Sequence, residues 1–255
     1  MFELADKVAL VTGARRGMGR AHAIALANQG AKVIVTDIAA GAEECQAVVS
    51  EIKAQGGTAS CFDLDVSKKD EVDKVFDDAV GHFGRLDILV NNAGIYFSKP
   101  ALLITEEEWE RMIHINLKGQ FLCAQRAAKE MAKNKWGRII NIASVASGQV
   151  GVGISGGAHY TASKGGIIGM SETLAVEWAP LGINVNVIAP GAIDTPMVQA
   201  AQLPQEAMAS ILARVPLRRI GRPEEVSALV VLLASNEASY ITGATFYVDG
   251  GWLAG

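Results

Sequence analysis

Short apolar segments alternate with longer helical segments along most of this 255-residue chain. The short segments are rich in β-branched and other apolar residues, which favours strands, and they cover residues 8–12, 32–37, 58–63, 86–91, 138–144, 184–189 and 245–248. Helical patterns cover residues 18–29, 42–54, 69–82, 105–133, 159–178, 204–214 and 223–234. Several strand segments are continuously apolar, as is typical of parallel strands covered on both faces. The alternation predicts an α/β fold, a doubly wound parallel sheet of about seven strands with helices on both faces.

The pattern continues without a linker, a low-complexity tract or a repeat, so we expect a single domain over residues 1–255. Two helix starts carry capping signals. Ser67 stands three positions before Asp70, and Thr105 stands three positions before Glu108. Such residues satisfy backbone N–H groups of the first turn, and acidic side chains there offset the helix dipole.

Charge and hydropathy exclude several classes of partner. The net charge is −4 and the isoelectric point is near 5.6. A nucleic-acid-binding protein needs a basic face, so we expect no nucleic-acid partner. No stretch reaches the ~18 uncharged apolar residues of a membrane span, and the N-terminal residues lack the pattern of a signal peptide. The sequence therefore predicts a cytoplasmic protein with no membrane association.

The three cysteines, Cys45, Cys61 and Cys123, are widely spaced and form no metal-binding motif. An odd number also argues against a framework of disulfides. We expect free thiols in a reducing compartment and no metal site.

A glycine-rich turn follows the first predicted strand, with Gly13, Gly17 and Gly19 in a Gly-x-x-x-Gly-x-Gly spacing. Between a strand and a helix, such a turn lets the backbone approach a pyrophosphate at the helix N-terminus. In this context the turn predicts a dinucleotide-binding domain of Rossmann type.

Asp37 ends the second predicted strand, where an acidic residue can accept hydrogen bonds from an adenosine ribose. Its carboxylate would repel a 2′-phosphate, and Ile38 and Ala39 supply no cation to offset it. Arg16 favours the opposite choice, because an arginine in the glycine turn can bind that phosphate. We give Asp37 more weight, so the predicted cofactor is NAD rather than NADP.

Tyr160 and Lys164 are four residues apart in a predicted helix, so they share one face. A cation beside a phenol stabilises the phenolate, and it lowers the phenol pKa from about 10 towards neutral. The pair therefore predicts a tyrosine that exchanges a proton at physiological pH.

Three motifs together resemble the short-chain dehydrogenase/reductase family, in its single-domain branch of about 250 residues. They are the glycine pattern, the run Asn91-Asn92-Ala93-Gly94 after the fourth strand, and the Tyr160-x-x-x-Lys164 pair. The resemblance extends from Lys7 to Gly251.

The resemblance implies roles for matching positions along the cofactor. Residues of the glycine turn would line the pyrophosphate and ribose: Gly13, Arg15, Arg16, Gly17, Met18 and Gly19. The adenine edge would meet Asp65 and Val66, beside Asp37 and Ile38. Asn92, Ala93 and Gly94 would lie under the ribose. The run from Pro190 and Gly191 to Ile193 and Thr195 would meet the nicotinamide, and Lys164 and Tyr160 its ribose.

The resemblance also implies a catalytic set of Asn116, Ser144, Tyr160 and Lys164. Tyr160 would exchange the proton, Lys164 would tune it, Asn116 would anchor a water in a proton relay, and Ser144 would polarise the substrate oxygen. Ser144 follows the run Asn141-Ile142-Ala143 but stands 16 positions before Tyr160, where the family usually shows 13. Ser147 stands at 13. We favour Ser144, with a three-residue insertion in the glycine-rich loop between them.

These features predict an NAD-dependent oxidoreductase that interconverts a secondary alcohol and a ketone. Two alternatives remain: an NADP-dependent 3-oxoacyl-thioester reductase and a non-catalytic dinucleotide sensor. We expect a substrate lid at about 195–214 and a mostly apolar pocket, with candidate contacts at Tyr96, Val150, Val152, Ile154, Met197, Val198, Leu203 and Trp252. His159 is expected to be structural. The resemblance implies a homotetramer.

Overall fold

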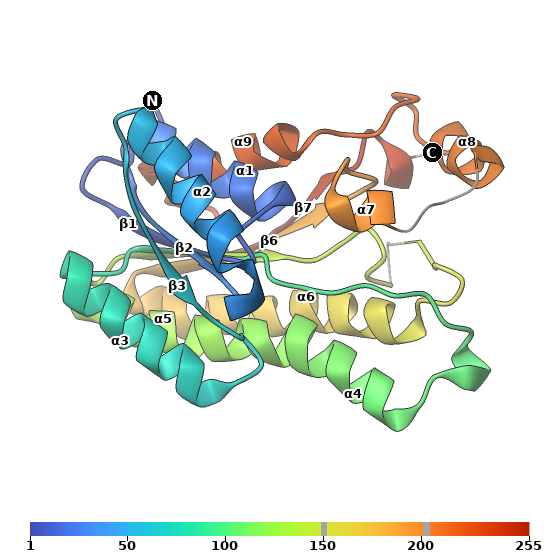
Figure 1. The fold of residues 1–255 in the computed structure, drawn as a ribbon, viewed down its shortest axis with the longest axis horizontal. Coiled ribbons are helices and arrows are strands. Elements are labelled where there is room, and N and C mark those ends of the chain that lie inside the picture. The colour runs from blue at the N-terminus through green and yellow to red at the C-terminus, as the bar shows by residue number, and fades with distance from the viewer. Residues whose placement is uncertain (149–151, 201–204, 255) are drawn as a thin grey trace.

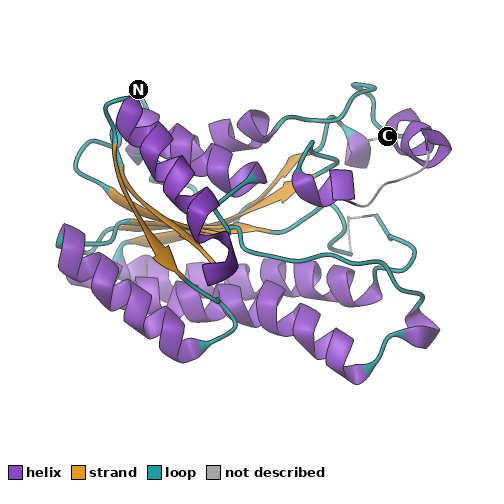
Figure 2. Ribbon diagram, viewed as in Figure 1, coloured by secondary structure: helices purple, strands orange, loops and turns teal. Residues whose placement is uncertain are grey.

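The computed structural model describes residues 1–148, 152–200 and 205–254. Within these ranges, seven strands form one sheet in the order β3-β2-β1-β4-β5-β6-β7 (Figure 2). The strands are β1 (Val8–Thr12), β2 (Lys32–Asp37), β3 (Thr58–Asp63), β4 (Ile88–Asn91), β5 (Gly137–Ile142), β6 (Ile183–Pro190) and β7 (Thr245–Val248). All six strand pairs are parallel. The predicted doubly wound Rossmann-type sheet is confirmed.

The central strands are buried on both faces, as their continuously apolar sequences predict. Every residue of β1, β4 and β5 is buried. Successive residues alternate between two cores: Val11 packs with the core on one face, and Leu10 with the core on the other. Each core is closed by its own layer of helices.

The helices cover the sheet from both sides (Figure 1). One layer contains α1 (Gly17–Asn28), α2 (Ala42–Ala54) and α9 (Pro223–Ala234), and the other contains α3 (Lys69–Phe83), α5 (Gly119–Asn134) and α6 (Ala158–Trp178). The short helices α7 (Pro196–Ala200) and α8 (Gln205–Ala213) lie beyond the carboxyl end of β6 (Figure 1). No described helix is both long and apolar enough to span a bilayer.

The helix predicted over 105–133 is interrupted. It comprises α4 (Glu106–Ile113), a π-helical segment (His114–Lys118) and α5. The predicted strand starting at 86 begins at Ile88, and the one ending at 144 ends at Ile142. Asp87, just before β4, accepts the Val8 N–H of β1 at its Oδ2 at 2.9 Å, and Ser144, beyond β5, accepts the Ala146 N–H at 3.1 Å.

One capping prediction is confirmed and one is wrong. Thr105 and Glu108 form a reciprocal capping box at the start of α4. At the start of α3 the N-cap is Lys68 and makes no side-chain cap. The Ser67 hydroxyl donates instead to Asp65 Oδ1 at 2.6 Å, and the Ser67 N–H donates to the same oxygen at 3.0 Å.

The carboxyl ends of β1 and β4 meet where the strand order reverses direction, the position at which doubly wound sheets bind ligands. Thr12 Oγ1 accepts hydrogen bonds from the backbone N–H groups of Asn92 and Ala93, both at 3.0 Å. Asn92 Nδ2 donates to the carbonyls of Thr12 and Gly13 at 2.9 and 3.0 Å. These bonds hold the two strand ends together beneath the crevice.

Candidate active site

The glycine turn leads into a helix N-terminus that has no cap. The N-cap residue of α1, Arg16, makes no side-chain cap, and the first turn contains no acidic residue. The unpaired N–H groups and the positive end of the helix dipole therefore favour an anion. Gly13 and Gly17 have φ values of 63° and 58°, which side chains with a Cβ rarely adopt. A Cβ on Gly19 would lie 2.2 Å from the Gly13 carbonyl oxygen, so α1 packs closely under the turn.

A cavity of about 1000 Å³ opens above this turn. Predicted cofactor residues that line it are Gly13, Arg15, Arg16, Gly17, Met18, Asp37, Ile38, Asp65, Val66, Asn92, Ala93, Gly94 and Thr195. The predicted substrate contacts Tyr96 and Met197 also line it. These features fit a nicotinamide dinucleotide. The uncapped N-terminus of α1 suits the pyrophosphate, the Asp37 carboxylate suits a ribose hydroxyl, and the apolar side chain of Val66 suits the adenine.

Sequence reasoning missed a group of lining residues on the helix opposite the turn. Arg111, His114, Ile115 and Lys118 border the cavity from α4 and the π-helical segment. Their spacing of three and four residues places them on one helix face, and this is the signal that could have identified them.

Asp37 is held by backbone and by a cation. Its Oδ1 accepts the Ile38 N–H at 2.9 Å, and its Oδ2 accepts the Arg15 N–H at 3.3 Å. The Arg15 Nε lies 3.6 Å from Asp37 Oδ1, and its Nη1 lies 3.3 Å from Glu44 Oε2. A carboxylate offers about four lone-pair directions, so Asp37 retains capacity for a ribose hydroxyl. Neither the Arg15 ion pairs nor Glu44 was foreseen from the sequence.

Asp65 is fixed at the far end of the cavity. Burial opposes its ionisation, but hydrogen bonds from Ser67 and Lys68 outweigh that effect and lower the pKa of Asp65. Beside it, a Cβ on Gly119 would lie 2.7 Å from a Val66 methyl carbon. Close packing of α5 therefore positions Val66 at the cavity wall.

The loop after β6 lies against the glycine turn. A Cβ on Gly17 would lie 3.3 Å from Pro196 Cδ and 3.8 Å from Thr195 Cβ. Gly191 donates its N–H to the Val248 carbonyl at 2.9 Å, and a Cβ there would lie 2.8 Å from Asp249 Cα. This loop start is therefore fixed against β7, which directs Thr195 towards the large cavity.

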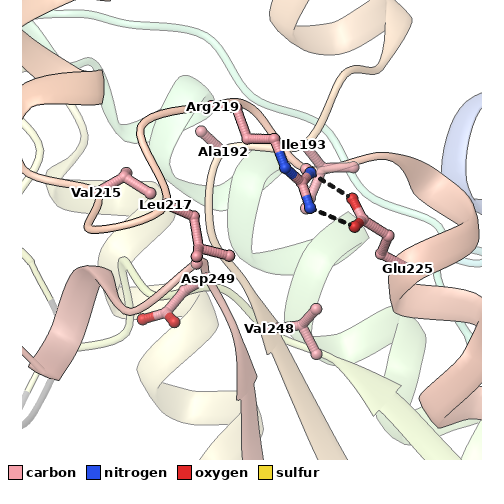
Figure 3. Close-up of a pocket in the computed structure, with 10 residues that line it drawn as sticks. Ala192, Ile193, Val215, Leu217, Arg219, Glu225, Val248 and Asp249 are labelled. Atoms are coloured by element: carbon pink, nitrogen blue, oxygen red, sulfur yellow. Dashed lines mark hydrogen bonds and ion pairs between the residues drawn. The ribbon is translucent and has the colours of Figure 1, made fainter.

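Six predicted cofactor residues do not line the large cavity: Gly19, Tyr160, Lys164, Pro190, Gly191 and Ile193. Gly191 contacts β7, and Ile193 lines a second cavity. That second cavity has a volume of about 110 Å³ and lies between the loop after β6, β7 and the start of α9. Figure 3 shows Arg219 and Glu225 joined across it, with Nη2 2.6 Å from Oε1. Asp249 also lines this cavity, and its carboxylate accepts the N–H groups of Gly251 and Leu253, both at 2.9 Å.

Ser144 and Tyr160, two of the predicted catalytic residues, lie together with Tyr96. We call this part of the structure the reaction end. The Ser144 side chain lies close enough to the Tyr160 phenol to favour a lower pKa there, and the rings of Tyr96 and Tyr160 are in edge contact with centroids 5.0 Å apart. The structure thus brings Ser144 to Tyr160. The Ser147 hydroxyl is buried without a hydrogen-bond partner among the described residues.

Lys164 lies beneath this pair. It is only 4% exposed, and its Nζ donates to the Ile142 carbonyl at 2.9 Å. The Nζ is 5.6 Å from the centroid of the Tyr160 ring. Burial lowers the pKa of Lys164 to about 8.

The predicted lowering of the Tyr160 pKa is wrong for this structure. Burial raises the pKa of Tyr160 to about 12, against the opposing hydrogen bond from Ser144, and nearby Tyr96 adds to the increase. Desolvation dominates because the Lys164 ammonium donates to a backbone carbonyl rather than to the phenol. At neutral pH the phenol therefore keeps its proton.

Asn116 lies within the π-helical segment and is fully buried. Its Oδ1 accepts the Ile95 N–H at 2.8 Å, and its Nδ2 donates to the Ile95 carbonyl at 3.0 Å. A Cβ on Gly94 would lie 3.3 Å from Asn116 Oδ1 and 3.8 Å from Lys164 Nζ. Asn116 thus fastens the loop after β4 beside Lys164. π-Helical turns are frequent at functional sites.

The predicted substrate contacts divide into three groups. Val152 is buried and donates its N–H to the Val145 carbonyl at 2.9 Å, while Ile154 is 36% exposed. Val198 and Trp252 do not line the large cavity. The Val198 N–H donates to Thr195 Oγ1 at 3.4 Å, and Trp252 lies against the Arg214 guanidinium. Val150 and Leu203 lie outside the described residues, as do positions 201–204 of the predicted lid.

His159, next to Tyr160 in the chain, is fully buried. Its ring makes edge contact with Phe97, with centroids 4.6 Å apart, and neither ring nitrogen has a partner among the described residues. Burial lowers the pKa of His159. Within the described parts of the chain, no cluster of His, Cys, Asp and Glu could hold a metal ion.

Comparison with known proteins gives matches over nearly the whole chain. The family model described as enoyl-(acyl carrier protein) reductase matches residues 13–253. A 3-oxoacyl-(acyl-carrier-protein) reductase of Thermotoga maritima is 42% identical over 98% of this chain and 99% of its own. One of Synechocystis sp. is 46% identical over 99% of both chains. A crystal structure of a putative NAD(P)-dependent gluconate 5-dehydrogenase from Beutenbergia cavernae, with bound NADP at low occupancy, has a TM-score of 0.93 and 37% identity, covering 100% of this chain and 99% of that one.

Proposed function

The chain belongs to the short-chain dehydrogenase/reductase family of oxidoreductases, and we propose that it reduces the ketone of a 3-oxoacyl thioester to the 3-hydroxyacyl thioester. The observation that carries this proposal is the placement of the Tyr160 phenol beside Ser144 and near the buried Lys164, whose Nζ lies 5.6 Å from the Tyr160 ring centroid. This arrangement suits a carbonyl oxygen that must receive a proton. The substrate class is supported by relatives that are 42% and 46% identical and are named 3-oxoacyl-(acyl-carrier-protein) reductases.

The residues of this chain have separate tasks in the proposed reaction. The glycine turn and Asp37 would hold a nicotinamide dinucleotide, which would supply a hydride for the carbonyl carbon. Ser144 donates a hydrogen bond to the carbonyl oxygen, and Tyr160 transfers its proton to that oxygen. Lys164, whose pKa is about 8, is suited to return a proton towards Tyr160. Asn116 keeps the loop at Ile95 in place beside them.

We propose NADH as the preferred reductant. Asp37 supports this choice, because its carboxylate lines the cavity where a ribose 2′-substituent would lie and would repel a phosphate there. The bound NADP in the Beutenbergia cavernae protein shows that a protein of closely similar fold accepts the phosphorylated cofactor. The cofactor choice in this chain therefore rests on its own side chains.

A second candidate is NAD-linked oxidation of a secondary alcohol to a ketone. Asp37 and the likeness to the putative gluconate 5-dehydrogenase favour it. In this reading, Tyr160 would act as a base and its pKa would have to fall well below 12 once the site is filled. The first candidate requires no such fall, and so we prefer it.

The discriminating experiment follows dinucleotide absorbance with purified protein and four substrate sets: acetoacetyl thioesters, simple ketones, secondary alcohols and polyols. We expect fastest turnover with an acetoacetyl thioester and NADH. Faster oxidation of alcohols or polyols with NAD would establish the second candidate. Tight NADH binding without turnover on the whole panel would contradict both and indicate a dinucleotide sensor.

We further propose that the active form is a cytoplasmic homotetramer. Apolar side chains remain exposed on this protomer: Trp109 on α4 is 41% exposed, Phe121 on α5 is 37% exposed, and Tyr247 on β7 is 36% exposed. Residues of this kind are enriched in subunit interfaces. Light scattering coupled to size-exclusion chromatography tests the assembly, and a mass near 27 kDa, about that of one 26.8 kDa chain, would contradict it.

A further inference from the structure

Three charged side chains form a cluster at the carboxyl end of β2: Arg15, Asp37 and Glu44. The Arg15 guanidinium lies between the two carboxylates, with Nε 3.6 Å from Asp37 Oδ1 and Nη1 3.3 Å from Glu44 Oε2. Arg15 and Asp37 line the large cavity, whereas Glu44 projects from α2 outside its wall. Glu44 therefore acts on the cavity through Arg15.

Arg15 is restrained on several sides. Its backbone N–H donates to Asp37 Oδ2 at 3.3 Å, and its side chain is 18% exposed. Its aliphatic part packs over Gly41, where an added Cβ would lie 2.3 Å from Arg15 Cδ. A guanidinium that is enclosed and already paired with two carboxylates is poorly available to another anion.

Arg16 differs from Arg15. It is exposed and makes no ion pair with any described residue. Two arginines at the ribose end of the site would by themselves attract a phosphate. Asp37 and Glu44 cancel their formal charge of +2, so the electrostatic balance depends on Glu44 as well as on Asp37.

We propose that Glu44 is a specificity-determining residue that holds Arg15 against Asp37, and thereby keeps the site selective for a dinucleotide without a 2′-phosphate. Released from Glu44, the Arg15 side chain can turn its guanidinium towards a 2′-phosphate. Glu44 is a positioning residue, because it contacts Arg15 and not the cavity. The inference rests on the proposed function only in requiring a dinucleotide at this site.

The first test compares Glu44→Gln with Glu43→Gln, measuring the Kd values of NADH and NADPH by calorimetry on protein without substrate. Glu43 is the matched control, because it is also exposed, lies on α2 and loses the same charge. Glu44→Gln should tighten NADPH binding ~3- to 10-fold and change NADH binding less than twofold, given the strength of partly exposed ion pairs. Glu43→Gln should change neither Kd beyond twofold.

A double-mutant cycle tests whether Glu44 acts through Arg15. In the Arg15→Gln background, Glu44→Gln should no longer improve NADPH binding. If the improvement persists without Arg15, or if Glu43→Gln produces it equally, Glu44 contributes only diffuse charge and the inference is overturned. Raising the ionic strength to about 1 M lowers the Debye length to about 3 Å. It should therefore reduce a long-range effect of the Glu44 charge more than an effect of its direct contact with Arg15.

The possible failures are distinguishable. If the wild type binds both dinucleotides and Glu44→Gln leaves the ratio of their Kd values unchanged, the inference fails and the proposed function stands. If the wild type binds neither dinucleotide, both fail. Thermal unfolding of each variant shows whether an altered Kd reflects a change in folding.

Discussion

Burial sets the protonation of the two groups at the reaction end. It raises the pKa of Tyr160 to about 12 and lowers that of Lys164 to about 8. At pH 7 the phenol is therefore neutral, and at pH 8 the lysine is about half protonated. A tyrosine that keeps its proton is a donor, which agrees with carbonyl reduction as the proposed direction.

Tyr160→Phe tests this role directly. Removing the hydroxyl should lower kcat about 10²- to 10⁴-fold, the usual contribution of a positioned acid or base. The Kd of NADH should change less than threefold, because the ring is retained. Turnover equal to the wild type would show that Tyr160 is not the proton donor.

Ser144→Ala should also lose activity, because Ser144 is the serine proposed to contact the substrate oxygen. Ser147→Ala is its matched control and should retain activity.

His22 provides a prediction about stability and pH. It is fully buried, its Nδ1 lies 2.8 Å from Ser227 Oγ, and burial lowers its pKa from 6.5 to about 3. Since the unfolded chain binds the proton more tightly, the stabilisation is full above pH 6.5 and is lost as the pH falls towards 3. The loss should be about 1.4 kcal/mol per pH unit within that window.

Urea unfolding of wild type and His22→Gln at pH 6.5 and pH 5 measures the effect. The wild type should lose ~1.5–2 kcal/mol more than the variant over this interval, while other groups titrate equally in both. Equal losses would mean that His22 is accessible to protons in the folded state.

The sequence predicted which residues form the candidate site better than it predicted which residues they contact. Tyr160, Lys164, Asp37 and the glycine turn follow from spacing and position along the sequence. The contact between Arg15 and Glu44 joins two elements across a loop, and no periodicity indicates it. The Tyr160 pKa depends on desolvation by surrounding atoms, which spacing does not describe.

At the scale of elements, the close contact between β1 and α1 depends on Gly19. A Cβ there would lie 2.2 Å from the Gly13 oxygen and 2.6 Å from Asn92 Nδ2, and neither group can move without breaking a bond that joins β1 to β4. Gly19→Ala should therefore destabilise the protein by roughly 1–3 kcal/mol, as overpacking usually does, and weaken dinucleotide binding.

Gly169→Ala is the matched control. Gly169 lies within α6, and an added Cβ would meet nothing within 4 Å. Alanine should stabilise that helix by about 0.5–1 kcal/mol. Thermal unfolding and NADH titration measure both variants, and an unchanged Gly19→Ala protein would contradict the close contact.

Element positions were largely foreseeable, but the π-helical segment was not. An uninterrupted helical pattern covers 105–133, and an extra residue in one turn leaves no distinctive composition. Asn116 shows why the turn is there: its carboxamide bonds both the N–H and the carbonyl of Ile95. That contact becomes visible only when the loop after β4 is placed next to the helix.

At the scale of the whole molecule, the alternation of strands and helices predicts the sheet because few topologies accommodate it. The same argument places the functional residues at the carboxyl ends of the strands. It does not predict that Pro196 lies over Gly17, since these residues are remote in sequence and meet only after the sheet has closed.

That contact has a kinetic consequence. Thr195, Pro196, Met197 and Ala200 line the cavity on the side of the glycine turn, so a dinucleotide lying along the turn would be covered by the start of α7. We expect compulsory order: the dinucleotide enters first and leaves last. In steady-state inhibition, NAD should be competitive with NADH and noncompetitive with the thioester. Competition of NAD with both substrates would indicate random entry, and α7 would then not control access.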